Sequence, residues 1–147
     1  MPTYSTNKKA LFDYEVLEKF EAGLVLIGTE VKSIRNNTVS LKGAFVTLHN
    51  KTANLINVHI PKYKFTGNID NYEPDRTRQL LLKAKEIDYL RGKSQEKGLT
   101  IVPISLYTKG RQIKLEIALV RGKKKFDKRE SIKKRETDRE IRRKIKT

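Results

Sequence analysis

Few residues in this chain combine the types and spacing that catalysis or metal binding requires. The two histidines, His49 and His59, stand near the ends of expected strands and match no metal-ligand motif. No serine lies in a GxSxG nucleophile elbow. Gly122-Lys123 is not part of a phosphate-binding loop, because Lys124 follows where that motif needs Ser or Thr. We therefore expect no catalytic centre, no metal site and no cofactor.

The acidic residues do not indicate general acid–base chemistry either. Glu21, Glu30 and Asp127 each stand beside basic residues, which is typical of ion pairs. Since neither nucleophiles nor acid–base groups stand out, we expect a protein that is not an enzyme.

Basic residues are the chemical feature that dominates the chain. There are 33 Lys and Arg against 17 Asp and Glu, a net charge of +16, and the pI is about 10.1. This balance favours a nucleic-acid partner. A protein bound to a membrane surface is the next candidate, but it would need a large apolar helix face.

Three basic clusters come from separate parts of the chain. They are Asn7-Lys8-Lys9, Lys32 with Arg35, and Arg76 with Arg78. On a small β-barrel they could converge on one side and contact phosphates. Scattered surface charge is the alternative interpretation, and the sequence alone leaves both open.

Half of the net charge lies in residues 123–147, which hold 13 Lys and Arg and 5 Asp and Glu. Apolar residues are sparse there. Helix-supporting pairs four residues apart contribute about 1–1.5 kcal/mol in total, whereas ordering a backbone costs about 1–2 kcal/mol for each residue. We predict a tail that is disordered or frayed alone and helical against a polyanion. The alternative is a solvated tail that only aids solubility.

Composition limits the compartment and the architecture. The chain has 147 residues and no cysteine, which excludes disulfides and thiolate zinc sites and fits a reducing cytosol. The first residues contain no apolar signal-peptide region, and no run approaches the roughly 18 apolar residues of a membrane span. We expect a cytoplasmic monomer with one domain, residues 1–122, and a basic tail, residues 123–147.

Hydrophobic patterns predict mainly short strands. We expect strands over 11–20, continued at 24–27 after an interruption at 21–23, and over 44–48 and 54–60. A hairpin is expected over 99–107 and 112–120, with Pro103 at an edge or a bulge. Helices are expected over 29–35, capped by Thr29, and from a cap at Asp75 to a stop at Gly92, with a short helical turn over 94–97. Together these elements predict a mainly β (α+β) protein, a small closed antiparallel barrel of OB type with about six strands and three short helices.

Several sequence blocks resemble one known family, the SsrA-binding proteins (SmpB). The matching blocks are NKKALFDYEVLEKFEAGLVLIGTEVKSIR (7–35), HIPKY (59–63), GNIDNYEPDRTRQLLL (67–82), GLTIVPISLY (98–107) and GKKKFDKR (122–129). They run from Asn7 into the tail, and the order of EAG…GTEVKS and GKK–DKR is specific to that family.

The resemblance implies an OB-like barrel that binds the tRNA-like domain of transfer-messenger RNA, where it stands in for the missing anticodon arm. It also implies that the tail enters the vacant mRNA channel of the small ribosomal subunit, contacts its rRNA near the decoding centre, and serves the rescue of stalled ribosomes by trans-translation. The RNA-facing positions of the family match Asn7, Lys8, Glu21, Glu30, Lys32, Arg35, Arg76, Arg78 and Leu81, and Lys9 joins them from its basic cluster. The tail motif matches Lys123, Lys124, Asp127, Lys128 and Arg129, with Lys125 and Phe126 lying between them.

Two other functions remain open at this point. A ribosomal or assembly protein with a basic extension would co-purify with one subunit in equal amounts. An RNA-processing enzyme would need a catalytic set, for which the sequence gives no candidate.

Overall fold

Seven antiparallel strands form one sheet in the computed structural model, which describes residues 3–64 and 72–123. The order across the sheet is β1-β6-β7-β2-β5-β4-β3. The strands are β1 (Thr3–Thr6), β2 (Tyr14–Leu24), β3 (Phe45–His49), β4 (Thr52–Ile56), β5 (Arg78–Leu81), β6 (Leu99–Lys109) and β7 (Gln112–Gly122). The described part of the chain is therefore mainly β, as predicted.

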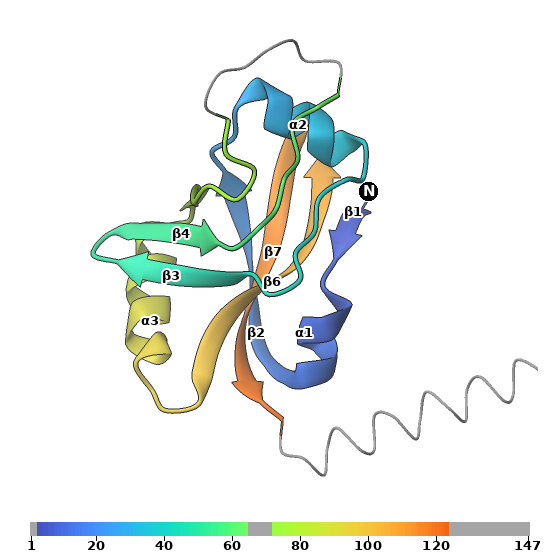
Figure 1. Ribbon diagram of the computed structural model, residues 1–147. Coiled ribbons are helices and arrows are strands. Elements are labelled where there is room, and N and C mark those ends of the chain that lie inside the picture. Colours follow the sequence, from blue (N-terminus) through green and yellow to red (C-terminus); the bar gives the residue numbers. More distant parts are fainter. Residues whose placement is uncertain (1–2, 65–71, 124–147) are drawn as a thin grey trace, which may run out of the picture.

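Within the described residues, three helices accompany the sheet: α1 (Lys8–Asp13), α2 (Gly28–Arg35) and α3 (Ala84–Ser94). Figure 1 shows α1 and α2 at opposite ends of the sheet, with α3 beside the β3–β4 hairpin. None of the described helices has the length and hydropathy that a membrane crossing needs.

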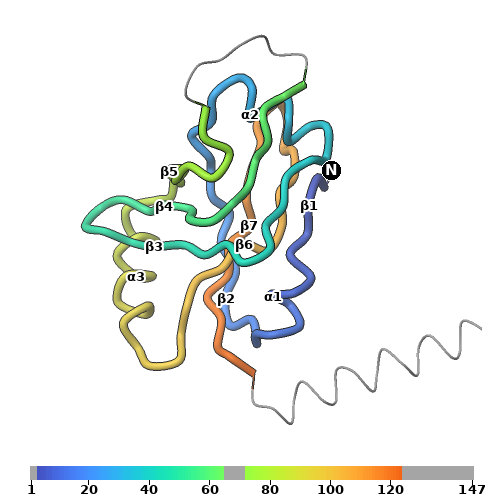
Figure 2. Tube along the Cα trace, in the orientation of Figure 1, coloured from blue at the N-terminus to red at the C-terminus, as the bar shows by residue number. Residues whose placement is uncertain are grey.

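The sheet bends back on itself around one main core. Val46 of β3 and Leu55 of β4 belong to the same buried cluster as Leu115 and Ile117 of β7. In Figures 1 and 2 the β3–β4 hairpin runs across the direction of β6 and β7. A second, smaller cluster lies on the other face of the sheet, where Ala10 of α1 covers Ala118 and Val120. The face of the sheet that points away from the main core is thus covered by α1 at one end. Toward the α2 end, the same face carries Lys114 of β7 and Gly23 of β2.

The prediction of a closed barrel is not confirmed, because the sheet has two ends, β1 and β3, that do not pair with each other in the described residues. Side chains and a helix cover that opening instead. Leu90 of α3 is completely buried in the main core. The side-chain amide of Asn7 donates to the carbonyl oxygens of Leu41, at 3.3 Å, and Pro103, at 2.9 Å.

The first predicted strand is wrong in its first part. Residues 8–13 are helical because Asn7 caps them: its Oδ1 accepts a hydrogen bond from the amide of Ala10 at 3.2 Å. Strand β2 begins only at Tyr14 and continues through 21–23 without the expected interruption. Apolar alternation over 11–20 did not reveal this cap.

The predicted helix from Asp75 is also wrong at its start. Residues 78–81 form β5, in which buried Arg78 and Leu80 alternate with exposed Gln79 and Leu81, and Figure 2 shows this strand beside β4. Helix α3 begins at Ala84 and runs two residues past Gly92. Residues 95–98 are turns and not the short helix that was predicted.

Other predictions are confirmed, in full or in part. The hairpin at the C-terminal side is β6 and β7, and its register shifts between Pro103 and Ser105, so the proline occupies a bulge. The helix predicted at 29–35 is α2, although its N-cap is Ile27 and not Thr29, and it is followed by Asn37 in the left-handed region with a φ of 59°.

The strand predicted at 44–48 is β3, shifted by one residue. The strand predicted at 54–60 is confirmed only in part, because β4 begins two residues earlier and ends at Ile56, where Asn57 follows with a positive φ of 64°.

Candidate nucleic-acid interface

Basic side chains from α2 and from the β6–β7 hairpin gather at the α2 end of the sheet. Lys32 and Arg35 are exposed on α2, and Arg111 is exposed in the turn between β6 and β7. Nη2 of Arg35 donates a hydrogen bond to the carbonyl oxygen of Arg111 at 3.4 Å, which ties the helix to the turn. Lys109 and Lys114 lie on the same hairpin. This end of the molecule is therefore suited to phosphate groups.

A row of three residues crosses three neighbouring strands beside these cations. Lys114 of β7 lies opposite Gly23 of β2, and Gly23 lies opposite Leu81 of β5. Residues directly opposite each other project from the same face of a sheet. Because Gly23 has no side chain, a gap remains between the side chain of Leu81 and the methylene chain of Lys114.

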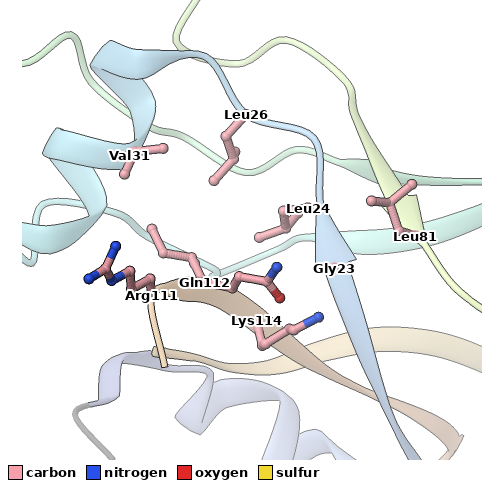
Figure 3. Close-up of a pocket in the computed structure, with 9 residues that line it drawn as sticks. Gly23, Leu24, Leu26, Val31, Leu81, Arg111, Gln112 and Lys114 are labelled. Carbon is pink, nitrogen blue, oxygen red and sulfur yellow. The ribbon is translucent and has the colours of Figure 1, made fainter. Parts of the chain in front are cut away.

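The gap forms part of a hollow of about 370 Å³. In Figure 3 the aliphatic side chains of Val31, Leu26, Leu24 and Leu81 lie on one side and Arg111, Gln112 and Lys114 on the other. Leu81 is 55% exposed. An apolar surface with cations at its rim can hold a base or ribose while the cations contact phosphates.

Glu21 adds a charged acceptor to this face, two residues before Gly23 on β2. Its Oε2 accepts a hydrogen bond from the hydroxyl of Tyr107 at 2.5 Å, and Nζ of Lys109 lies 3.3 Å from its Oε1. The bond from Tyr107 is the main reason that the pKa of Glu21 lies below its ordinary value, while desolvation opposes the shift and Lys109 and Lys114 add to it. Burial and the Glu21 carboxylate raise the pKa of Tyr107. Glu21 is thus a fixed carboxylate among cations, able to accept hydrogen bonds from base amino groups.

A buried ionic network supports the N-terminus of α2. The amide of Ile27 donates to Oε1 of Glu30 at 3.0 Å, and Nε of Arg78 donates to its Oε2 at 2.7 Å. Arg76 donates to both oxygens of the same carboxylate. Burial acts to raise the pKa of Glu30, but the bonds from Arg76, Ile27 and Arg78 outweigh it and hold that pKa below its ordinary value. The carboxylate is therefore charged and fully paired.

The network changes the interpretation of three predicted RNA-facing residues. The side chains of Glu30 and Arg78 have no exposed surface, so in this structure they position α2 and the neighbouring segment. Arg76 keeps 29% of its side chain exposed and remains available to a phosphate. Arg78 lies in β5 and not in the helix that was predicted from Asp75.

The cluster near the N-terminus lies apart from this end. Lys8 and Lys9 are exposed on α1, at the opposite end of the sheet from α2 (Figure 1). Asn7 is only 5% exposed, and its amide bonds to protein carbonyls. The three basic clusters therefore do not converge on one patch: two lie around α2 and one on α1.

The C-terminal tail begins beside α1. The amide of Lys123 donates to the carbonyl oxygen of Asp13 at 3.0 Å. The remaining candidate tail residues, Lys124, Lys125, Phe126, Asp127, Lys128 and Arg129, lie outside the described residues.

Sequence reasoning missed Lys109, Arg111, Lys114 and Tyr107. The signal was present for Lys114, because Gln112, Lys114 and Glu116 alternate with buried Ile113, Leu115 and Ile117 along β7 and must face outward. The sequence alone does not show which strands flank β7. Only the sheet order shows that Gly23 of β2 lies opposite Lys114.

The histidines form no metal site in the described part of the chain. His59 Nδ1 lies 2.8 Å from Oδ1 of Asp75 on the surface. No group of three or more His, Cys, Asp or Glu that could hold a metal ion occurs among residues 3–64 and 72–123.

Comparisons with known proteins identify the chain's relatives. The model of the family described as SmpB protein matches residues 4–147. An SsrA-binding protein of Oleidesulfovibrio alaskensis is 52% identical over 139 residues, which cover 95% of this chain and 89% of the relative. The SsrA-binding protein of Acaryochloris marina is 51% identical over 142 residues, 97% of this chain and 92% of the relative. A solved structure described as "tmRNA-SmpB: a journey to the center of the bacterial ribosome" matches with a TM-score of 0.70 and 39% identity, over 90% of this chain and 95% of that chain.

Proposed function

The chain belongs to the SmpB protein family, and from this premise we propose that it is an RNA-binding adaptor of trans-translation and not an enzyme. It binds the tRNA-like domain of transfer-messenger RNA and delivers that RNA to stalled ribosomes in the cytoplasm. The observation that carries the proposal is the likeness, at 39% identity over 90% of the chain, to a protein seen with transfer-messenger RNA and the bacterial ribosome.

The α2 end supports RNA binding independently of that likeness. Arg111 and Lys114 line one side of a hollow whose other side is aliphatic and includes Leu81, and Arg35 is bonded to the turn that carries Arg111. We assign phosphate contacts to Arg76 and to the cations of this end, and an apolar contact to Leu81. Glu21 supplies an acceptor for base donors.

The remaining candidate residues take two different parts in the proposal. Asn7, Glu30 and Arg78 hold the elements that carry the contact residues. Lys8 and Lys9 on α1 form a second basic surface, which adjoins the point where the tail leaves the body. That position suits contact with ribosomal RNA, because a tail directed into the small subunit brings α1 close to it.

Two further parts of the proposal concern architecture. Residues 1–122 form an OB-like body, since a bent antiparallel sheet with an uncovered face is the platform that OB folds offer to nucleic acids. Residues 123–147 form a separable tail that enters the mRNA channel only when the channel is vacant, with Lys123 to Arg129 contacting rRNA near the decoding centre. The +8 charge of this tail favours an anionic groove.

The test deletes residues 123–147 and compares the truncated chain with the full chain. Binding to the tRNA-like RNA should persist, because the α2 end is intact, while tagging of a stalled ribosome in a reconstituted system should be lost. Loss of both activities would argue against a separable tail. Failure of the full chain to select transfer-messenger RNA from total RNA, with equal co-purification of one ribosomal subunit, would favour a ribosomal protein instead.

A further inference from the structure

A second hollow lies beside α2, lined by residues to which neither the sequence nor the proposed function assigns a role. Its volume is about 470 Å³, within the range of pockets that hold small ligands. The lining residues come from the end of α2 and the residues after it, and from the segment after β4: Ser33, Asn36, Thr38, Pro61, Lys62, Tyr63 and Lys64.

Tyr63 is the aromatic side chain of this hollow, and its position is fixed by α2. The amide of Tyr63 donates to the hydroxyl of Thr29 at 3.0 Å. The ammonium of Lys32 lies 5.8 Å from the centre of the Tyr63 ring, a distance typical of a cation–π contact. A ring held in this way loses little conformational freedom when a second flat group stacks against it.

The floor of the hollow is polar and rigid. The hydroxyl of Thr38 donates to the carbonyl oxygen of Ser33 at 2.7 Å, and the two hydroxyls lie 2.7 Å apart. Exposed Asn36 adds an amide with both donors and an acceptor. The Asn36 amide can meet the edge of a base or a ribose hydroxyl, while the hydroxyls of Ser33 and Thr38, already bonded to each other, hold the floor in place.

Lysine side chains lie beside the Tyr63 ring and the hollow. Lys62 and Lys64 are exposed at one side of the hollow, and Lys32 lies at the ring. An aromatic platform flanked by Lys is the usual arrangement for single-stranded nucleic acid, since the base stacks and the phosphates pair with the ammonium groups.

We propose that this hollow binds one unpaired nucleotide of the same RNA, with the base against Tyr63 and the phosphates toward Lys62 and Lys64. The inference rests on the proposed function and adds a second contact to it. Val31 lines the Leu81 hollow and Ser33 lines this one. Side chains two positions apart on a helix point in directions about 200° apart. The two hollows therefore flank α2 on opposite sides. The RNA therefore crosses α2 over Lys32 and Arg35.

The first test replaces the aromatic ring. Tyr63→Leu should weaken binding of a transcript of the tRNA-like domain about tenfold, the scale of one lost stacking contact, and Tyr63→Phe should bind as the wild type. Tyr89→Leu is the matched control, because Lys93 lies 5.9 Å from the Tyr89 ring in the same kind of contact, but on α3. Its affinity should not change. Affinities are read by fluorescence anisotropy at one salt concentration, with the thermal unfolding midpoint measured for each variant.

The second test needs no substitution in the ring. Ultraviolet irradiation of the wild-type chain with the transcript should crosslink RNA to Tyr63 or its neighbours, and mass spectrometry locates the site. Lys62→Gln should lower the salt slope of binding by about 0.7–0.9, whereas Tyr63→Leu should leave the slope unchanged.

Three results would overturn the inference: Tyr63→Leu binding within twofold of wild type, RNA crosslinks only outside the hollow, or, in the ribosome-bound complex, a Tyr63 crosslink to protein in place of RNA. Failure of the wild-type chain itself to bind the transcript would instead refute the proposed function, so the two failures are distinguishable.

Discussion

Nε of Arg78 donates a hydrogen bond at 2.7 Å to the carboxylate of Glu30, and neither side chain reaches the surface. The other guanidinium nitrogens of Arg78 donate to the carbonyl oxygens of Val58, at 2.6 Å, and Pro74, at 2.8 Å. No buried side-chain nitrogen or oxygen of the described residues lacks a partner. This ion pair joins the first turn of α2 to β5 and, through the other nitrogens of Arg78, to Val58 and Pro74, and so holds the helix beside which both hollows lie.

Breaking the pair from one side should destabilise the fold strongly. Glu30→Gln leaves the buried guanidinium of Arg78 without its countercharge, and the free energy of unfolding should fall by about 3–5 kcal/mol. Urea denaturation followed by circular dichroism measures the change. Glu86→Gln is the matched control, because Glu86 makes the same capping bond to the amide of Lys83 at 3.1 Å but is bonded to no arginine among the described residues. A loss in Glu30→Gln no larger than that of the control would contradict a structural role for the pair.

Acid should weaken the fold through the same carboxylate. The pKa of Glu30 lies below its ordinary value of 4.5, so the unfolded chain takes up the proton first as the pH falls. The stability that Glu30 contributes is therefore complete above about pH 4.5 and is lost as the pH falls toward the pKa in the folded state. Unfolding free energies measured from pH 7 to pH 3 should decline in the wild type, and the decline should be smaller in Glu30→Gln. Parallel curves would assign the acid sensitivity to other carboxylates.

The elements that the sequence predicts well are those whose burial alternates over many residues. In β7, Ile113, Leu115 and Ile117 point to the core, and the hairpin with β6 follows from that pattern. Residues 78–81 show the same alternation over four residues only, too few to outweigh the helical spacing of Leu80, Ala84 and Ile87. Short strands are decided by their partners, here β4 and β2.

The candidate site, too, is predicted from the sequence only in part. Charge and motif resemblance identify Lys32, Arg35 and Arg76, whose side chains do reach the surface. Charge and motif resemblance do not distinguish these exposed residues from Arg78, which is two residues after Arg76 and completely buried. Nor can they find Tyr63, because its role depends on a contact with α2 across 34 residues of sequence. Long-range contacts decide which basic side chain is buried in the protein and which one is exposed.

Asn7 offers a test of how the open side of the sheet is held. Asn7→Ala removes the helix cap and both amide bonds, leaving two carbonyl oxygens without a donor, and should cost about 2–4 kcal/mol in unfolding free energy. Asn7→Ser keeps a cap for α1 but not the bonds to Leu41 and Pro103, so it should recover about 1 kcal/mol. Thermal or urea denaturation distinguishes the two. Equal stability of the serine and alanine variants would mean that the cap contributes nothing.

A larger residue at Gly23 should fill the Leu81 hollow while the protein still folds. A Cβ added at Gly23 would lie 3.3 Å from Cβ of Leu81, a spacing that a shift of a few tenths of an ångström relieves. Gly23→Ala should therefore fold and bind RNA with a modest loss. Gly23→Val places two further methyl groups between Leu81 and Lys114, and should weaken binding of the tRNA-like RNA about tenfold, the scale of one lost base contact.

The Gly23 experiment depends on separating binding from stability. Gly92→Ala is the control, because an added Cβ there meets no atom within 4 Å on α3, and it should stabilise the helix by about 1 kcal/mol while leaving RNA affinity unchanged. Leu81→Ala should lower affinity with little loss of stability, since Leu81 is 55% exposed. Adding Gly23→Val to Leu81→Ala should then lower affinity less than it does in the wild type, because both changes remove the same apolar contact. Fully additive losses would show that Gly23 and Leu81 do not serve one binding surface.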